Sequence, residues 1–404
     1  VARLNANNAI DEYFGSLKLD YTISPKYVLS MRYMRDQGYL TSPLGVTGNY
    51  QRVTAVPQNA LISLQQVLSP SLINETKFGF NGQKTRINGV AATVNGIDLS
   101  AISVNFTGSV AIPGIGGQGT SAGAATLGGL IRSNSSQNGR AQPYTSYTMS
   151  FIDNLTWLKG NHSFKFGAEF RPVRMYTDRL GGTTYTFSNL NDLLANRPSG
   201  IQILGDVSAP NPLHNGIATN RYLKQQYSIF YAQDEWRIRP NLTLNYGLRY
   251  EYYSPLHENQ DLYTLFIVEK GDLATGNWYK SSKANFGPRL ALSWSPTRFN
   301  NMTVLRIGAG YYYGPGQTED QIQPIDSDRV TVNLTNTAFP VNSQQIIASV
   351  DPSKLSGFQP RAYSSGYTLP EKVLSYTASI QQQLPGNTVL TVAYVGSQGR
   401  NLFL

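Results

Sequence analysis

The sequence predicts an all-β protein that crosses a membrane as an antiparallel up-and-down β-barrel, with about twelve long strands in this chain. Three observations support this prediction. Long stretches alternate apolar and polar residues, short turns alternate with long connections, and aromatic residues gather near the ends of the predicted strands. Because side chains of a strand point to alternate faces, such stretches form strands with one oily and one polar face, as in a barrel wall.

The clearest strand runs from Leu242 to Tyr252. Leucine and tyrosine occupy every second position there, and polar or small residues occupy the positions between them. At about 3.3 Å per residue, roughly eleven residues span about 35 Å, which suits a tilted crossing of a hydrocarbon layer about 30 Å thick. The preceding strand begins near Gln225. The turn between the two is Arg239-Pro240-Asn241, where proline fixes φ and asparagine tolerates turn geometry.

Five further hairpins repeat this pattern along the chain. Each has two alternating strands joined by a short turn rich in Pro, Gly, Ser or Asn. In chain order the predicted strand pairs are Tyr13–Tyr21 with Tyr27–Arg35, Ala60–Leu68 with Leu72–Gly82, Thr145–Leu158 with His162–Asp178, Phe286–Pro296 with Met302–Tyr313, and Val373–Leu384 with Thr388–Val395.

Long connections separate the hairpins. The longest cover Gln83–Pro143, the segment from Asp178 to about Lys224, and Gly314–Glu371. Within the second, a short helix is predicted to begin near Asn189 and to end before Pro198. Tight turns at one end and long loops at the other are typical of outer-membrane barrels, whose turns face the periplasm and whose loops face outside. The alternative fold is a large secreted β-protein with two packed sheets, which gives no reason for every long connection to lie at one end.

Aromatic residues support the barrel. The tryptophans Trp157, Trp236 and Trp294 lie near the short-turn ends of their strands. Tyrosines gather near the long-loop ends: Tyr250, Tyr252, Tyr253, Tyr311, Tyr312 and Tyr313. Two aromatic girdles at the headgroup levels of a bilayer have this arrangement.

Composition excludes several other classes. Of the 404 residues only 14% are charged, and no run of about 18 apolar residues exists, so no membrane-spanning helix is predicted. Cysteine is absent, which removes disulfides and thiolate metal sites, and the three histidines are scattered. The net charge is +9, but Lys and Arg are dispersed, so we expect no nucleic-acid partner. We expect neither a cofactor nor a metal centre.

The segment Phe230–Glu258 (FYAQDEWRIRPNLTLNYGLRYEYYSPLHE) resembles TonB-dependent outer-membrane receptors, and the similarity is greatest to the Oar-like group. That group carries the signature F-x-Q-D-x-W followed by L-T-L-N-x-G-L-R-Y-E. Matching residues here are Gln233, Asp234, Trp236, Leu242–Asn245 and Gly247–Glu251, and Phe230 lies one position further upstream than the signature places it. Similar blocks occur at Asp153–Arg171, Phe286–Pro296 and Ala393–Phe403.

The resemblance implies that residues 1–404 form part of a larger barrel of about 22 strands. The family's plug domain and TonB box, which lie N-terminal to the barrel, and its last C-terminal strands are then expected outside this chain. We expect the protein to reside in the outer membrane of a Gram-negative bacterium, in contact with outer-membrane lipid. The TonB complex is expected as a partner through the plug domain.

Charged residues on the polar strand faces are expected to line the lumen, because a charge facing lipid costs about 2–4 kcal/mol at the bilayer midplane. The main lumen-lining candidates are Lys165, Glu169, Arg171, Asp234, Arg249, Glu251 and Arg289, and further candidates are Lys18, Asp20, Arg32, Glu75 and Lys77. The resemblance implies a plug against which they pair, and pairing across neighbouring strands is the alternative.

An enzymatic function is not expected. GxSxG, HExxH and paired-carboxylate motifs do not occur. His257 lies beside Glu258, Asn259 and Asp261 and is the remaining candidate for a general base. Asp326 and Asp328 are a candidate pair for calcium, with solvated turn residues as the alternative.

The expected function is energy-coupled uptake of a bulky nutrient of unknown identity, for which this chain supplies the barrel wall and the extracellular loops. Tyr252, Tyr253, Tyr312 and Tyr313 are candidates for substrate contact, with a role in the aromatic girdle as the alternative. The alternatives for the whole protein are a structural or adhesive surface barrel without transport and a passive porin.

Overall fold

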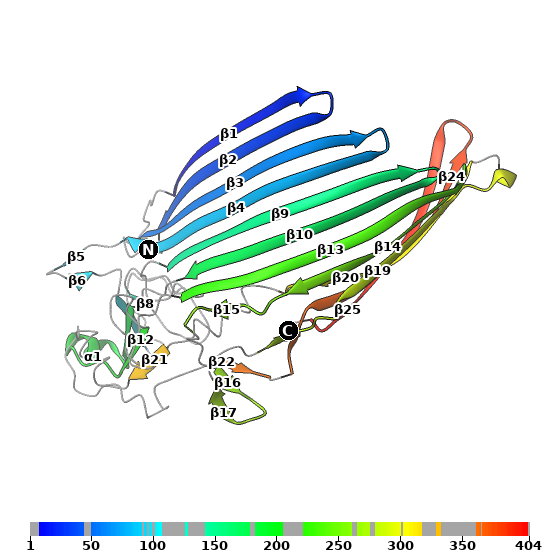
Figure 1. The fold of residues 1–404 in the computed structure, drawn as a ribbon. Helices are drawn as coiled ribbons and strands as arrows, with labels where there is room; N and C mark the ends of the chain where they lie inside the picture. Colours follow the sequence, from blue (N-terminus) through cyan, green and yellow to red (C-terminus); the bar gives the residue numbers. More distant parts are fainter. Residues whose placement is uncertain are drawn as a thin grey trace.

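The computed structural model describes residues 8–43, 50–90, 93–94, 97–98, 102–106, 126–127, 142–177, 182–204, 221–260, 265–274, 279–299, 302–316, 329–332, 361–364 and 366–402. Its main feature is one 13-stranded antiparallel sheet that curls through space (Figure 1). The long strands pair in chain order: β1 (Ala9–Ser24), β2 (Tyr27–Pro43), β3 (Tyr50–Ser69), β4 (Leu72–Val90), β9 (Gln142–Lys159), β10 (His162–Thr177), β13 (Arg221–Arg239), β14 (Leu242–Tyr253), β19 (Phe286–Trp294), β20 (Thr303–Gly314), β24 (Glu371–Leu384) and β25 (Thr388–Arg400).

This order confirms the predicted up-and-down arrangement. Each predicted hairpin forms, and the short turns lie together at one end of the sheet, with the long connections at the other (Figure 1). The turn between β9 and β10 contains Gly160 at φ +59°, and the turn between β24 and β25 contains Gly386 at φ +76°. Left-handed backbone of this kind is easily adopted by glycine, which explains why these residues mark the turns. Residues Thr297–Phe299 form a 3-10 helix between β19 and β20.

The first four strands extend further than predicted. β2 continues to Pro43 and β3 begins at Tyr50, so only residues 44–49 separate strands for which a long connection was expected. That expectation was wrong because apolar residues stop alternating near Arg35, while the backbone pairing continues through polar positions. β3 has 20 residues and spans about 66 Å, well beyond a hydrocarbon layer.

The two faces of the sheet differ in chemistry. We call the face that carries Leu244, Tyr246 and Leu248 the apolar face, and the face that carries Arg249 and Glu251 the polar face. Directly opposed residues of paired strands share a face, so the register extends both faces across the sheet. Large apolar side chains are exposed on the apolar face: Phe166, Phe170, Phe230, Tyr246, Leu248, Leu290, Ile307, Ile380 and Val392.

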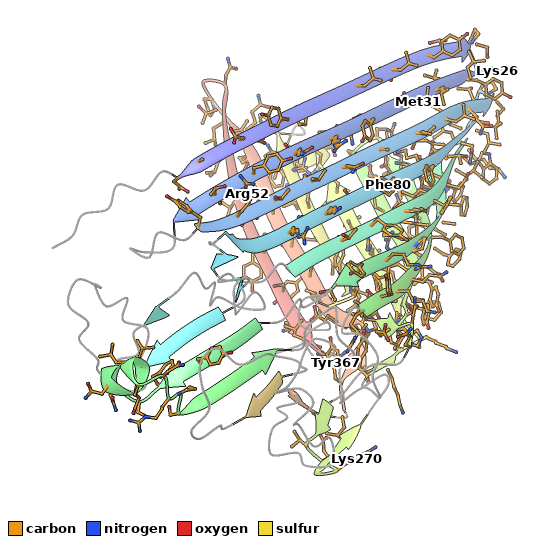
Figure 2. The ribbon with its side chains drawn as sticks, turned by 90° about the vertical axis from the view of Figure 1, so that its left-hand side faces the viewer. Lys26, Met31, Arg52, Phe80, Lys270 and Tyr367 are labelled. Carbon is orange, nitrogen blue, oxygen red and sulfur yellow. The ribbon has the colours of Figure 1, made fainter. Side chains whose placement is uncertain are left out.

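At the loop end of β14 the polar face is the more enclosed of the two. In β14 the Glu251 side chain is only 5% exposed, whereas Leu248 on the apolar face is 47% exposed. Oily side chains turned outward and charged ones turned inward are the arrangement of a transmembrane barrel wall rather than of a sandwich with a dry core. Figure 2 shows the wall with its side chains, with Lys26 at the turn end and Arg52 toward the loop end.

Most, but not all, of the aromatic residues predicted for the two girdles lie on the apolar face. Trp157, Trp236 and Trp294 all lie on the apolar face near the turns, as predicted for a girdle. The tyrosines at the loop end divide: Tyr250, Tyr252, Tyr311 and Tyr313 lie on the apolar face, and Tyr253 and Tyr312 lie on the polar face.

Segments at the loop end form small sheets of their own (Figure 1). The largest has the order β21 (Arg329–Val332), β12 (Gly200–Leu204), β11 (Gly182–Phe187), β7 (Ile102–Phe106) and β8 (Thr126–Leu127). The others join β17 (Asp272–Ala274), β16 (Leu265–Ile267) and β22 (Arg361–Tyr363); β18 (Lys280–Ser281) and β23 (Thr368–Leu369); and β5 (Thr93–Val94) and β6 (Ile97–Asp98), while β15 (His257–Glu258) pairs with β13. Tyr185, Phe187, Leu256, Tyr279 and Leu369 are buried here.

The predicted short helix is present as α1 (Leu190–Leu194). Asn189 is its N-cap, as expected, and its side-chain oxygen accepts a hydrogen bond from the backbone N–H of Asp192 at 2.9 Å. Among the described residues no helix is long and apolar enough to span a membrane.

Candidate functional site

The candidate site lies on the polar face of four neighbouring strands, β10, β13, β14 and β19. Six of the seven main lumen-lining candidates share this face: Lys165, Glu169, Arg171, Arg249, Glu251 and Arg289. Lys165 lies opposite Gln233, which is in register with Gly247 and then Arg289. Two rows further toward the loops, Glu169 and Glu251 flank Ile229. The register therefore brings together charges that lie far apart in the sequence.

Glu251 is the centre of the charged cluster. Arg249 donates from Nε to Glu251 Oε1 at 2.8 Å, and Arg289 Nη2 lies 4.0 Å from the same oxygen. The Tyr253 hydroxyl donates to Glu251 Oε2. A carboxylate that is almost fully buried requires such partners, because an unpaired buried charge is strongly unfavourable.

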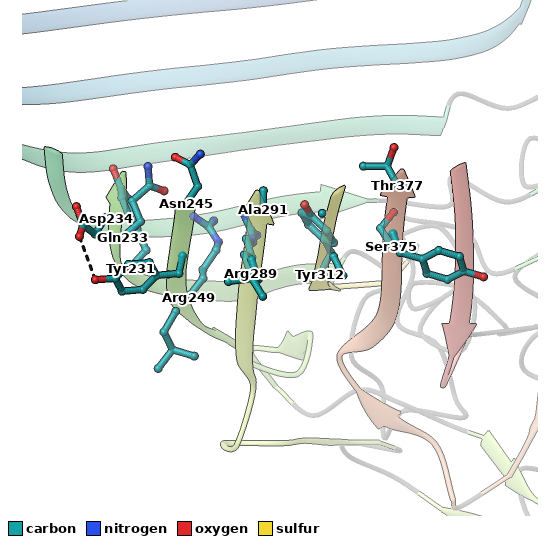
Figure 3. Close-up of a pocket in the computed structure, with 18 of the residues that line it drawn as sticks. Tyr231, Gln233, Asp234, Asn245, Arg249, Arg289, Ala291, Tyr312, Ser375 and Thr377 are labelled. Atoms are coloured by element: carbon teal, nitrogen blue, oxygen red, sulfur yellow. Dashed lines mark hydrogen bonds between the residues drawn. The ribbon is translucent and has the colours of Figure 1, made fainter. Parts of the chain in front are cut away.

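Arg289 links this cluster to an open cavity. Its guanidinium carbon lies 4.3 Å from the centroid of the Tyr312 ring, within the range of a cation–π contact. The cavity has a volume of about 880 Å³ (Figure 3). The polar-face residues that line it are Lys165, Tyr231, Gln233, Asn245, Gly247, Arg249, Arg289, Ala291, Gly308, Gly310, Tyr312, Ser375, Thr377 and Val395. A cavity of this size, with several polar groups and three cations, is suited to a polar or anionic ligand.

The Tyr231 ring packs against Gly167. A Cβ on Gly167 would lie 2.2 Å from the Tyr231 ring, so only glycine leaves room for the ring at this position. The Tyr231 hydroxyl donates to Asn154 Oδ1 at 2.7 Å across β10. The pair fixes the ring at the edge of the cavity, and the F-G-A-E segment of β10 contains this glycine for a steric reason.

A second ion pair lies closer to the loops. Arg171 donates from Nε to Glu169 Oε1 at 2.9 Å, and its guanidinium lies 6.0 Å from the centroid of the Tyr227 ring. Both of these clusters pair charges within or across neighbouring strands, which was one of the two predicted alternatives. Arg249 and Arg289 still present cationic groups to the cavity, since both line it.

Asp234 borders the cavity in Figure 3 but does not share the polar face, and its prediction as a lumen-lining residue was wrong. It lies directly opposite Tyr246 and Phe164, so it is on the apolar face near the turns. Its Oδ2 accepts a hydrogen bond from the Tyr246 hydroxyl at 3.0 Å and lies 2.6 Å from His162 Nδ1. The prediction relied on the charge of the residue. Its even spacing from Phe230 and Trp236, which face outward, indicated the opposite side.

The four tyrosine candidates are also on different faces. Tyr252 lies opposite Ser228 on the apolar face, and Tyr313, on the same face, donates to the backbone oxygen of Phe286 at 3.1 Å. Tyr253 lies on the polar face but is only 4% exposed. Tyr312 alone among the four lines the cavity, with 44% of its surface exposed. Substrate contact remains a prediction for Tyr312.

The residues considered for catalysis or metal binding are not grouped into a site in the part of the chain that is described. His257 pairs with Lys224 in the sheet, and Glu258 accepts a hydrogen bond from the backbone of Gln260 at 2.8 Å. Asp261, Asp326 and Asp328 lie outside the described residues. No group of three or more His, Asp or Glu side chains suited to a metal occurs among the residues described.

Comparison with known proteins gives the same picture of the fold. Residues 2–404 match the family described as an outer membrane beta barrel domain. Similar solved structures include the outer membrane transporter YddB from Escherichia coli (14% identity, TM-score 0.57, covering 96% of this chain and 40% of that chain). Another is the copper transporter OprC (10% identity, TM-score 0.52, covering 97% of this chain and 45% of that chain). A third is the ferric-catecholate import receptor Fiu from E. coli K12 (11% identity, TM-score 0.51, covering 98% of this chain and 52% of that chain). The chain thus spans about half or less of these proteins. No curated protein matches the sequence.

Proposed function

Because the chain belongs to the outer membrane beta barrel domain family, we propose that it supplies the barrel wall and extracellular loops of a TonB-dependent receptor for energy-coupled uptake of a bulky nutrient. It is an outer-membrane protein of a Gram-negative bacterium. The observation that carries the proposal is the fold likeness to a transporter over 96% of this chain, which corresponds to 40% of the larger protein.

The polar face supports a transport path. It carries a cavity with Lys165, Arg249, Arg289 and Tyr312 at positions that face away from the oily side of the wall. Arg249 and Arg289 are partly compensated by Glu251, so the cavity keeps an excess of positive charge. We propose that these groups contact a plug or a passing polar substrate. The resemblance to the Oar-like group favours a carbohydrate or peptide.

The test is a nutrient panel with strains that lack the full gene or that lack TonB. Energy-coupled uptake predicts that the gene deletion impairs growth on particular nutrients and that the TonB deletion impairs growth on the same nutrients. A structural or adhesive barrel predicts unchanged growth on every nutrient and weaker attachment to a surface or partner. A passive porin predicts steady conductance of the purified protein in a planar bilayer and uptake that persists without TonB. Either of these results overturns the proposal.

A further inference from the structure

Cationic side chains gather on the apolar face toward the loop end of the wall. We call the following residues the cationic band: Arg52 of β3, Lys84 and Arg86 of β4, Arg174 of β10, Lys224 of β13, Lys372 of β24 and Arg400 of β25. Arg35 of β2 also lies on the apolar face, but closer to the turns than Thr41, the residue opposite Arg52, and is not a member. The register places each of them on the same face as the outward oily residues of its strand, such as Phe78 in β4 and Phe230 in β13. These cations therefore point away from the candidate site.

The band lies about one bilayer thickness from the tryptophan girdle. On β13, Trp236 follows Lys224 by twelve positions. Twelve residues rise about 40 Å along a strand, and a strand tilted by about 45° then climbs about 28 Å across the membrane. This height matches the hydrocarbon thickness of about 30 Å. If the tryptophans mark one headgroup level, Lys224 marks the other.

The other members follow the same level around the tilted wall. Arg174 lies directly opposite Lys224. From Arg174 toward β1, Arg86 and then Arg52 lie progressively further from the turn end than the positions in register with Arg174. From Lys224 toward β25, Lys372 lies closer to the turn end than Lys224 does. A steady offset from strand to strand is what tilted strands show when their residues share one height.

Acidic residues do not neutralise this band. Among the described residues, the only carboxylate on the apolar face at the loop end is Asp11 on β1, since Asp153 and Asp234 lie toward the turns. No ion pair within the described part of the chain involves a member of the band. An uncompensated row of cations at a headgroup level attracts anionic lipid.

Aromatic rings accompany the cations. Lys372 Nζ lies 4.1 Å from the Tyr311 ring centroid and 5.8 Å from that of Tyr313. Tyr176 and Tyr222 pack at 5.0 Å between ring centroids, two positions further toward the loops than Arg174 and Lys224. At this depth a long cationic side chain extends its charged end into the headgroup layer and keeps its methylene groups in the hydrocarbon layer, and tyrosine rings are common beside it.

We propose that the cationic band binds the phosphate groups of lipid A, the bisphosphorylated and multiply acylated glycolipid of the leaflet at the loop end. The positive charges of the band complement the phosphates, and the apolar face between the band and the tryptophan girdle complements the acyl chains. The proposal is independent of transport and of the nature of any substrate.

The test uses the full-length polypeptide that contains this chain, purified in a neutral detergent, with hexa-acylated bisphosphorylated lipid A as the probe. Lipid A is expected to raise the Tm of the wild type by several degrees. The triple variant R86Q/R174Q/K224Q is expected to lose more than half of this shift. The control K18Q/R32Q/K77Q removes the same number of charges from the polar face and is expected to keep the full shift.

Two further measurements keep the proposal testable if the triple variant does not fold. In the wild type, monophosphoryl lipid A is expected to give a smaller shift. Raising the salt from about 0.1 M to 1 M is expected to weaken the shift, because the screening length falls from about 10 Å to about 3 Å. Equal shifts for both lipids at both salt levels overturn the proposal. So does an equal loss in the control variant, or an equal shift with inositol hexakisphosphate, which would indicate a site for soluble phosphates rather than for lipid.

Discussion

Asp234 and Tyr246 face each other across β13 and β14, and the tyrosine hydroxyl donates a 3.0 Å hydrogen bond to the carboxylate on the oily side of the wall. His162 Nδ1 lies 2.6 Å from the same oxygen. The Asp234 side chain is 3% exposed, although it sits on the outward face. An acidic group is tolerated here because it lies near the turns and because two polar side chains cover it.

The first prediction concerns this pair. Tyr246→Phe removes one of the two hydrogen-bond partners of a buried carboxylate and keeps the ring. We expect it to lower the free energy of unfolding by about 2 kcal/mol, as for a hydrogen bond to a charged group. Urea unfolding in detergent micelles measures the change. Tyr250→Phe, on the same strand and face, is the control and is expected to cost less than about 0.5 kcal/mol. Equal losses in the two variants would contradict the assignment.

A second prediction concerns the centre of the charged cluster. Glu251→Gln leaves Arg249 and Arg289 without their shared carboxylate, and we expect it to cost about 3 kcal/mol. Glu235→Gln is the matched control, since Glu235 is 46% exposed and lies 3.8 Å from Arg237. Its loss is expected to stay below about 1 kcal/mol, as for exposed ion pairs. Unfolding in urea with the two variants side by side provides the comparison, and a control as damaging as Glu251→Gln would refute the cluster.

The third prediction concerns Gly167. A methyl group at this position would overlap the Tyr231 ring, so Gly167→Ala is expected to cost about 1–3 kcal/mol and to free the ring from Asn154. Gly15→Ala is the control, because a Cβ on Gly15 has no neighbour within 4 Å. When the ring is removed by Y231S, adding G167A is expected to cost much less free energy of unfolding than G167A costs in the wild type. Additive losses would show that the ring does not cover this glycine.

Alkaline pH is expected to loosen the packed loops around Tyr279. Burial raises the pKa of this tyrosine above its ordinary value of 10.0, and its hydroxyl accepts a hydrogen bond from the Leu256 backbone. The unfolded tyrosine therefore loses its proton at a lower pH than the folded one. The stabilisation is fully present below about pH 10 and falls as pH rises above it.

Limited proteolysis at pH 8 and pH 10.5 measures this effect. Cleavage near Leu256 is expected to accelerate at the higher pH, and Tyr279→Phe is expected to reduce that acceleration while it weakens the loop packing at pH 8. A variant with the same acceleration as the wild type would show that another group is responsible.

The hairpins were predictable because their signals are local. Turn residues such as Pro240 and Gly160 and the alternation in β14 each lie within a few neighbouring positions. The small sheets at the loop end were not predictable, since β7 and β11 pair in parallel although they come from different connections of the chain. β7 alternates Ile102, Val104 and Phe106 with polar residues, but a strand of five residues does not specify which distant strand it pairs with.

The candidate site was predictable as a face but not as a set of contacts. Counting alternate positions from Leu248 places Arg249 and Glu251 on the opposite face, and the structure confirms this. The same count would have placed Asp234 with Phe230, and charge was given more weight than spacing. Two partners of Glu251, Arg249 and Tyr253, lie two positions away on the same strand, whereas the approach of Arg289 depends on the register between β14 and β19, which one sequence does not specify.

The most direct test of the wall is a cysteine scan through β14. Since these 404 residues contain no cysteine, single substitutions at Leu244, Asn245, Tyr246, Gly247, Leu248 and Arg249 can each carry a nitroxide label in lipid bilayers. Relaxation by oxygen, which dissolves in the lipid, is expected to be strong at 244, 246 and 248 and weak at 245, 247 and 249, with a water-soluble nickel complex giving the reverse. Labels that show no alternation, or that show oxygen access at the odd positions, would contradict an oily outer face and a polar inner face.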